Sequence, residues 1–149
     1  GKITGEVAMS GVRVVKNKNN AVEGFSFAIT NKSNIHITPK GQIDVFNFFG
    51  KRVAELPINA LEKNVLAQSE RTLFEQWKQS YTSYGRLRAR VRSEFGFGFP
   101  AEEREVVFYN LPRFAGIKIL ITLVVAFFVI RKIYQRKRLK KDHNLILGS

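Results

Sequence analysis

Four arginines in one short segment are the residues best suited to bind a charged ligand. They recur at every second position of GRLRARVRSEF, residues 85–95, as Arg86, Arg88, Arg90 and Arg92. Because side chains alternate between the two faces of a strand, all four are predicted to lie on one face, opposite Leu87, Ala89 and Val91. Such a basic ladder could bind an anionic polymer, for example a wall teichoic acid, or phospholipid head groups.

A second interpretation treats the ladder as an ordinary solvated sheet face. Glu75, Glu103 and Glu105 are candidate partners on neighbouring strands, and cross-strand pairs of opposite charge stabilise a sheet by about 0.2–1 kcal/mol each. Nucleic acid is not expected as a partner. An RNA-binding sheet interleaves aromatic side chains with basic ones on the same face, and this ladder has none.

Phenylalanines form the second candidate binding feature. Phe97 and Phe99 lie in FGFGFP, residues 95–100, which has no phosphate-binding lysine and is predicted to be a hairpin loop. Exposed aromatic side chains at a loop tip can be partner hot spots or membrane-interface anchors. Alternatively, the two rings fold back onto the end of the domain. Phe46 and Phe48 share one face of a predicted strand, and we expect both in the core.

Catalytic, metal and cofactor sites are not predicted. His36 and His143 are the only histidines, and the chain has no cysteine. Ser33 and Asp44 are near His36 in sequence, but a triad needs a base within hydrogen-bonding reach of a nucleophile and an acid that orients it. We expect His36 to be half-exposed or bonded to a turn backbone. One histidine among scattered acids also lacks metal-ligand spacing.

The elements that carry these residues are predicted to be strands. Between Ile3 and Leu111 the chain consists of short alternating or β-branched runs separated by Gly, Asn and Pro. The runs are 12–15, 22–31, 41–58 with a turn at 49–51, 65–77, 85–95 and 103–112. About seven strands without a helix are typical of an antiparallel β-sandwich of immunoglobulin type and not of an α/β fold. Phe25, Phe27 and Ile29 should share the core face, with Trp77 also in the core.

A different pattern begins at Phe114. From Phe114 to Ile130 the chain has 17 residues, of which Lys118 is the only charged one. As a helix this stretch is roughly 25 Å long, near the lower limit for crossing a bilayer. Apolar side chains occur all round it, whereas a core helix of a soluble protein shows a stripe. Lys118 is close enough to the outer end to extend its amine to the interface.

A basic cluster follows the apolar stretch directly. It consists of Arg131, Lys132, Arg136, Lys137, Arg138, Lys140 and Lys141. Such a cluster beside a span marks the cytoplasmic side and attracts anionic lipid head groups. The sequence therefore predicts a domain at 1–112 outside the cell, a transmembrane helix at 113–132 and a basic cytoplasmic tail at 133–149. A core helix and a nucleic-acid arm are the weaker alternatives.

Composition agrees with this division. The net charge is +13 over 149 residues, and nearly half of the excess lies in the last 19 residues. The remaining chain is long enough for one domain with a core that needs no disulfides. Because the chain begins with Gly1 rather than methionine, we expect a piece of a longer precursor or a processed form.

Several segments carry a family resemblance. They are NIHITPKG at 34–41, FGKRVAELPIN at 49–59, NVLAQSER at 64–71 and GRLRARVRSEFG at 85–96. Together they resemble the second immunoglobulin-like domain of bacterial cell-surface proteins related to the WxL-interacting proteins, over about residues 20–112. Ala67 stands where that group commonly has proline, and Leu87 where it has tyrosine. The resemblance implies a two-domain ectodomain whose first domain is missing here, surface anchoring and no enzymatic activity.

These observations lead to one main functional hypothesis. The chain is predicted to be a non-enzymatic, single-pass cell-membrane protein that binds or presents a protein or an anionic wall polymer at the envelope. Its expected partners include the lipid bilayer itself, and no cofactor is expected. The alternative is a docking subunit of a larger membrane assembly, which small residues on the helix would favour; Ala115, Gly116 and Ala126 are the ones present.

Overall fold

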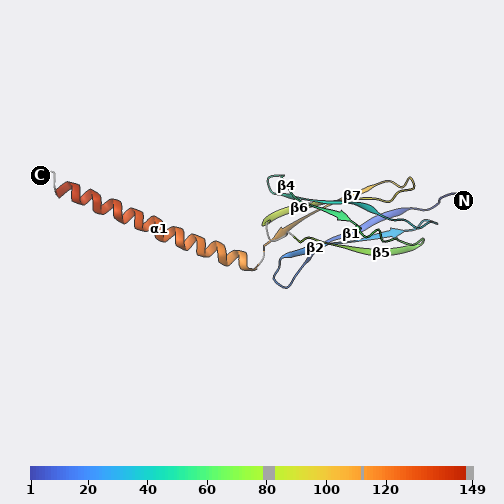
Figure 1. Ribbon diagram of the computed structural model, residues 1–149, viewed down its shortest axis with the longest axis horizontal. Coiled ribbons are helices and arrows are strands. Elements are labelled where there is room, and N and C mark those ends of the chain that lie inside the picture. The colour runs from blue at the N-terminus through green and yellow to red at the C-terminus, as the bar shows by residue number, and fades with distance from the viewer. Residues whose placement is uncertain (79–82, 112, 147–149) are drawn as a thin grey trace. The chain divides into compact units, whose positions relative to one another are not determined.

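The computed structural model describes residues 1–78, 83–111 and 113–146, and within the helix it describes the side chains of 116–136. The chain divides into two compact units, Gly1–Pro112 and Arg113–Ser149 (Figure 1). Each unit is described by itself below.

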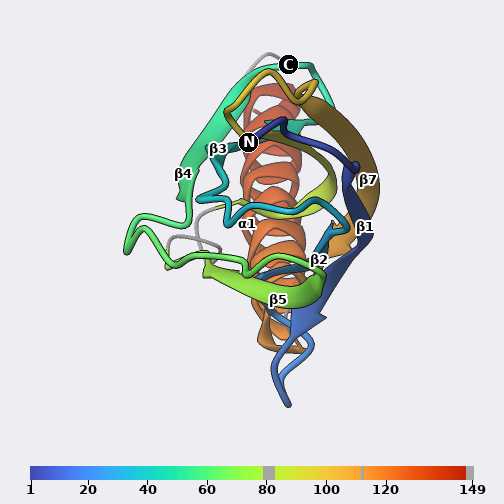
Figure 2. The same ribbon diagram turned by 90° about the vertical axis from the view of Figure 1, so that its right-hand side faces the viewer.

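The first unit consists of two antiparallel sheets. Its strands are β1 (Val7–Lys16), β2 (Val22–Asn31), β3 (Lys40–Asn47), β4 (Arg52–Ile58), β5 (Ser69–Gln76), β6 (Gly85–Glu94) and β7 (Glu102–Asn110). One sheet has the order β1-β2-β5 and the other β4-β3-β6-β7 (Figure 2). The prediction of a mainly β unit with about seven strands is confirmed. The largest differences are that β1 begins at Val7 and not at Val12, and that β5 begins at Ser69 and not at Val65.

The core lies between the two sheets because each strand turns alternate apolar residues inward. In β2 the side chains of Phe25, Phe27 and Ile29 are at most 1% exposed. Val45 and Val91 from the other sheet belong to the same buried cluster. Burying a side chain of this size stabilises the fold by about 1.5–3 kcal/mol.

Trp77 is buried immediately after β5, as predicted. Its ring stacks on Phe25 at a centroid distance of 6.2 Å and meets Phe108 edge-on at 6.3 Å. These contacts join residues of both sheets, so the single tryptophan fixes how the layers pack.

A buried asparagine, Asn31, closes the end of the sandwich at which β2 finishes. Its Nδ2 donates hydrogen bonds to the carbonyl oxygens of Ile35, Val65 and Leu66 at 2.8–3.2 Å. Its Oδ1 accepts hydrogen bonds from the backbone N–H and the hydroxyl of Ser33. The amide therefore ties the segment after β2 to the segment before β5.

Asn110 has the corresponding role at the opposite end. Its Oδ1 accepts a hydrogen bond from the N–H of Val22 at 3.0 Å, and its Nδ2 donates to the carbonyl of Ser83 at 2.6 Å. Asn20 donates to the carbonyl of Leu111 at 3.2 Å. The end of β7 is thus held against the β1–β2 turn and the start of β6.

The second unit is a single helix, α1 (Arg113–Ile146). It continues past residue 132, where the span was predicted to end, because residues 117–146 contain neither Gly nor Pro and the basic segment is rich in good helix formers. The apolar side chains between Ile117 and Tyr134 are 46–70% exposed. Within the part of the chain that the structure describes, no helix is long and apolar enough to cross a membrane.

Candidate binding surface

The outer face of the four-stranded sheet carries the arginine ladder. In β6 the side chains of Leu87, Ala89 and Val91 are buried, so the intervening arginines point outward, as the alternation predicts. Across the ladder from β7, the cross-strand partners are Tyr109 for Arg86, Val107 for Arg88, Glu105 for Arg90 and Glu103 for Arg92. On the β3 side they are Phe46 for Arg88, Asp44 for Arg90 and Gln42 for Arg92.

The ladder therefore has two chemically different halves. Arg90 and Arg92 lie among acids and an amide, and we call this part the neutralised half. Arg86 and Arg88 lie among apolar and aromatic residues, and we call this part the open half.

In the neutralised half the arginines are paired. Arg90 Nε donates to Glu105 Oε1 at 3.0 Å and lies 3.2 Å from Glu103 Oε1. The hydrogen bond to Glu105, together with the charge of Glu103, raises the pKa of Arg90. Arg92 pairs with Glu94 along its own strand at 3.3 Å. Glu103 and Glu105 thus act as the sheet-face interpretation expects, and solvent screening keeps the contribution of each exposed pair to stability small.

Glu75, the third acid suggested as a partner, is not near the ladder. It lies on β5 in the other sheet, where its Oε1 accepts a hydrogen bond from the N–H of Asn59 at 2.7 Å. Consecutive strands of a sandwich can belong to either sheet, so the sequence alone did not show which sheet β5 joins. The position of Glu75 relative to the ladder therefore depended on the tertiary structure.

The open half contains the least paired charges of the ladder. Arg88 approaches Glu105 only to 3.8 Å, and Arg86 has no ion pair within the described part of the chain. The guanidinium carbons of Arg88 and Arg90 each lie 5.5 Å from the centroid of the Phe46 ring. Such cation–π contacts position the arginines without cancelling their charge.

The expectation that Phe46 and Phe48 belong to the core is wrong. In β3 the buried residues are Ile43 and Val45, so Phe46 falls on the outer face and is half-buried beneath the arginines. Phe48 follows the strand in a turn and is 69% exposed. Nucleic acid was not expected as a partner, partly because the ladder itself has no aromatic residue. Phe46 of the neighbouring strand β3 nevertheless puts an aromatic ring on that face.

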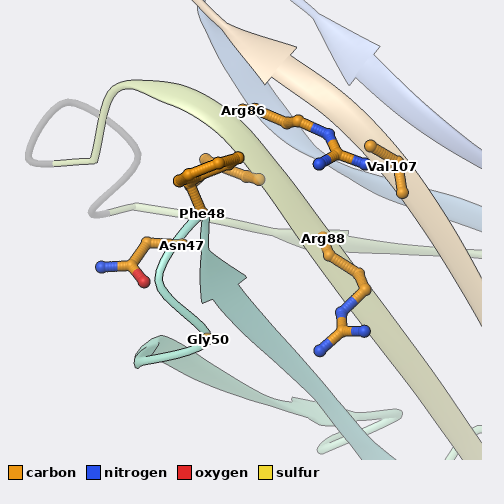
Figure 3. A pocket seen from close by; sticks show the side chains of 7 residues that line it. Asn47, Phe48, Gly50, Arg86, Arg88 and Val107 are labelled. Atoms are coloured by element: carbon orange, nitrogen blue, oxygen red, sulfur yellow. The ribbon is translucent and has the colours of Figure 1, made fainter.

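A shallow depression of about 180 Å³ lies at the open half. It is lined by Arg86 and Arg88 from β6, Phe48 from the β3–β4 turn and Val107 from β7 (Figure 3). Its volume is below that of typical small-molecule pockets. The depression is large enough for one phosphate or carboxylate group of a larger ligand, for which a guanidinium group is a suitable partner.

The two phenylalanines of the β6–β7 loop have different environments. Phe97 is 65% exposed with φ at +52°. Phe99 is partly buried and packs against the core, and its N–H donates to the carbonyl of Gly96 at 3.0 Å. The two interpretations of this loop therefore apply to one residue each, and Phe97 alone is available to a partner.

His36 and Ser33 do not form a catalytic pair. The Nδ1 of His36 accepts a hydrogen bond from the N–H of Ala67 at 3.1 Å, the turn-backbone contact that was expected. The hydroxyl of Ser33 donates to Asn31 at 2.6 Å. Among the described residues, no group of His, Cys, Asp and Glu could hold a metal ion.

The basic residues assigned to membrane topology lie along α1. Lys118, Arg131, Lys132 and Arg136 are exposed. The side chains of Lys137, Arg138, Lys140 and Lys141 lie outside the part that the structure describes.

No protein-family model matches this chain, and the comparisons found neither a curated protein nor a solved structure similar to it.

The open half was not singled out by sequence reasoning, although a signal was present. Asp44 lies two residues before Phe46, and a charged side chain in a strand marks the face that meets solvent. Residues two apart in a strand share a face, so Phe46 lies on the same face as Asp44. This is the arginine face once β3 and β6 are known to be neighbours.

Proposed function

We propose that this chain is a non-enzymatic, single-pass protein of the bacterial cell surface. Its β-sandwich binds or presents a protein or an anionic wall polymer at the envelope, and α1 anchors it in the membrane. The observation that carries the proposal is the apolar surface of α1.

Within the second unit, no described residue covers the apolar side chains of α1. The stretch from Phe114 to Ile130 contains one charge, and its side chains from Ile117 onward are exposed in every direction round the helix axis. Thr122 is the only polar residue between Ile119 and Ile130, and its hydroxyl donates to the carbonyl of Lys118 at 2.9 Å. A helix whose polar groups are satisfied internally suits a lipid environment.

The basic segment after Ile130 supports an orientation. Positive residues beside a span remain on the cytoplasmic side, so the sandwich would lie outside the cell. The continuation of α1 through this segment supports a helical basic extension whose first residues, from Arg131, lie at the level of the anionic head groups.

The strand order supports an immunoglobulin-like sandwich within this proposal. The chain crosses from one sheet to the other between β2 and β3, between β4 and β5, and between β5 and β6. Crossings of this kind between two antiparallel sheets are typical of that class. The resemblance to the WxL-interacting group rests on the sequence motifs.

Binding is assigned to the open half of the ladder. Arg86 and Arg88 offer guanidinium groups beside the exposed Phe48 ring, whereas Arg90 is already held by two carboxylates. An anionic polymer or an acidic protein loop suits these groups.

The test is protease accessibility in wall-stripped cells that carry one tag before Gly1 and another after Ser149. Loss of the first tag with survival of the second supports both the anchor and its orientation. Survival of both tags until the cells are lysed would contradict the proposal. That result would mean that both ends of the chain are protected inside the cell.

A further inference from the structure

Four segments meet at the end of the sandwich from which β7 leaves, which we call the exit end. Cross-strand pairing of Lys16 with Val22 places the β1–β2 turn there, and pairing of Asn47 with Leu87 places the β3–β4 turn beside the start of β6. Trp77 follows β5 at the same end, bonded to the carbonyl of Glu23. Figure 1 shows both turns at the end of the sandwich opposite the N-terminus.

The exit end is basic, and it carries one exposed acid, Glu23, near the start of β2. Its described turn segments 17–21, 48–51, 77–78 and 83–84 contain Lys18, Lys51 and Lys78 and no Asp or Glu. All three lysines are exposed, and none has an ion pair within the described part of the chain. At the opposite end two lysines are paired, Lys32 with Glu6 and Lys40 with Glu62.

The exit end also presents apolar side chains. Phe48 and Phe49 are 69% and 89% exposed and contact each other edge to face at 5.6 Å. Their turn is well defined, because Asn47 Oδ1 accepts hydrogen bonds from the N–H groups of Phe49 and Lys51 at 3.0 and 2.9 Å. Leu111 adds a further half-exposed apolar residue.

Adjacent exposed aromatic rings and unpaired lysines at one end of a domain match the boundary of a bilayer. There the rings enter the interface and the amines meet lipid phosphates. A wall polymer would complement the charge but would leave two adjacent phenylalanines in water. An anionic membrane surface accounts for both features.

We infer that the exit end rests on anionic phospholipid head groups, with Phe48 and Phe49 inserted at the interface and Lys18, Lys51 and Lys78 on the phosphates. The inference rests on the proposed anchoring by α1. Only three residues separate Asn110 from Phe114, so anchoring holds the exit end, and not the Phe97 end, beside the bilayer.

The experiment uses the full chain in vesicles, with an environment-sensitive fluorophore on a single cysteine. Because the chain has no cysteine, each introduced thiol is unique. Three variants are compared: Phe49→Cys at the exit end, Phe97→Cys as the matched exposed phenylalanine at the other end, and Thr122→Cys in the helix. Quenching is measured with nitroxide-labelled lipids and with aqueous iodide, in phosphatidylcholine alone and with phosphatidylglycerol added.

The label at 49 is expected to be quenched by nitroxide lipid and shielded from iodide severalfold more than the label at 97. Each lysine near an anionic surface changes the contact equilibrium by about fivefold. Lys51→Glu should therefore weaken lipid quenching at 49 in vesicles with phosphatidylglycerol, and Lys63→Glu at the opposite end should not.

The outcomes separate this inference from the proposed anchor. Lipid quenching at 122 without any at 49 overturns the head-group contact and leaves the anchor intact. Absence of lipid quenching at 122 overturns the anchor, and absence at both 122 and 49 overturns the anchor and the contact together. Equal lipid quenching at 49 without phosphatidylglycerol overturns the recognition of anionic lipid. Shielding of 49 from iodide without lipid quenching overturns the contact with lipid and assigns the exit end to a second copy of the chain.

Discussion

At the scale of single residues, the four arginines differ because their neighbours differ. Arg90 has two carboxylates within 3.2 Å, whereas Arg86 faces Tyr109 across the sheet. A guanidinium group that is already paired contributes little to a new ligand, because the ligand must displace the existing carboxylate. The binding strength of the ladder should therefore be concentrated at Arg86 and Arg88.

Arg86→Gln should weaken binding to purified wall teichoic acid by on the order of tenfold at low ionic strength, the value of one charge-assisted hydrogen bond. Arg92→Gln is the matched control, because it removes the same charge from a paired position of the same strand. The measurement is retention of the full chain in detergent on immobilised polymer. Unchanged retention for Arg86→Gln would contradict the role of the open half.

The pKa of Glu62 is a second property that can be tested at the residue scale. The hydrogen bond from Lys40, at 2.6 Å, and then the charge of that lysine lower the pKa of Glu62. A lowered pKa means that the ion pair stabilises the fold at neutral pH and that this contribution is lost as the pH falls through the lowered value. In an NMR titration Lys40→Gln should return the pKa of Glu62 toward its ordinary value. An unshifted pKa in the parent protein would contradict the pair.

At the scale of elements, buried amides hold the ends of the strands together. Asn31 closes the connections after β2 and before β5 with five hydrogen bonds. Because the side chain is fully buried, its removal would leave the carbonyls of Val65 and Leu66 without this donor. A buried polar group that loses its hydrogen bond lowers the stability of the fold, whereas an exposed one can bond to water instead.

Asn31→Ala should lower the free energy of unfolding by about 3 kcal/mol. Asn34→Ala is the control, since Asn34 is exposed and water can replace its bonds to Lys2 and Thr4; its cost should be below about 1 kcal/mol. Urea unfolding followed by the fluorescence of Trp77 measures both. Similar losses for the two variants would show that Asn31 does not act through burial.

At the scale of the whole molecule, the core belongs entirely to the first unit. Every residue of the buried cluster lies between Val7 and Phe108. The proposed anchor therefore contributes no side chain to that cluster, and folding of the sandwich should not need α1.

A chain that ends at Pro112 should unfold cooperatively and at nearly the same urea concentration as the full chain in detergent. It should also remain in solution after cell lysis, whereas the full chain should sediment with membranes. A large loss of stability in the shorter chain would mean that α1 is part of the folded sandwich. Sedimentation of both chains would show that the sandwich binds membranes without α1.

Local pattern was sufficient for much of the fold. Alternation and turn residues placed most of the strands, and they placed the arginines on one face because the two-residue period of a strand needs no tertiary information. The inward residues Phe25, Phe27 and Ile29 followed from the same period. The apolar run from Phe114 and the basic segment after it are likewise properties of the sequence itself.

Only the tertiary structure decided which side chains lie next to each other on neighbouring strands. The acids that meet Arg90, the outward position of Phe46 and the absence of Glu75 from the ladder all depend on which strands share a sheet and in what register. A register shift of one residue moves every side chain to the other face, so local pattern cannot settle these contacts. Phe48, Phe49 and three lysines lie at the same end of the sandwich for the same reason. They belong to segments far apart in sequence that the packing of the two sheets places at one end.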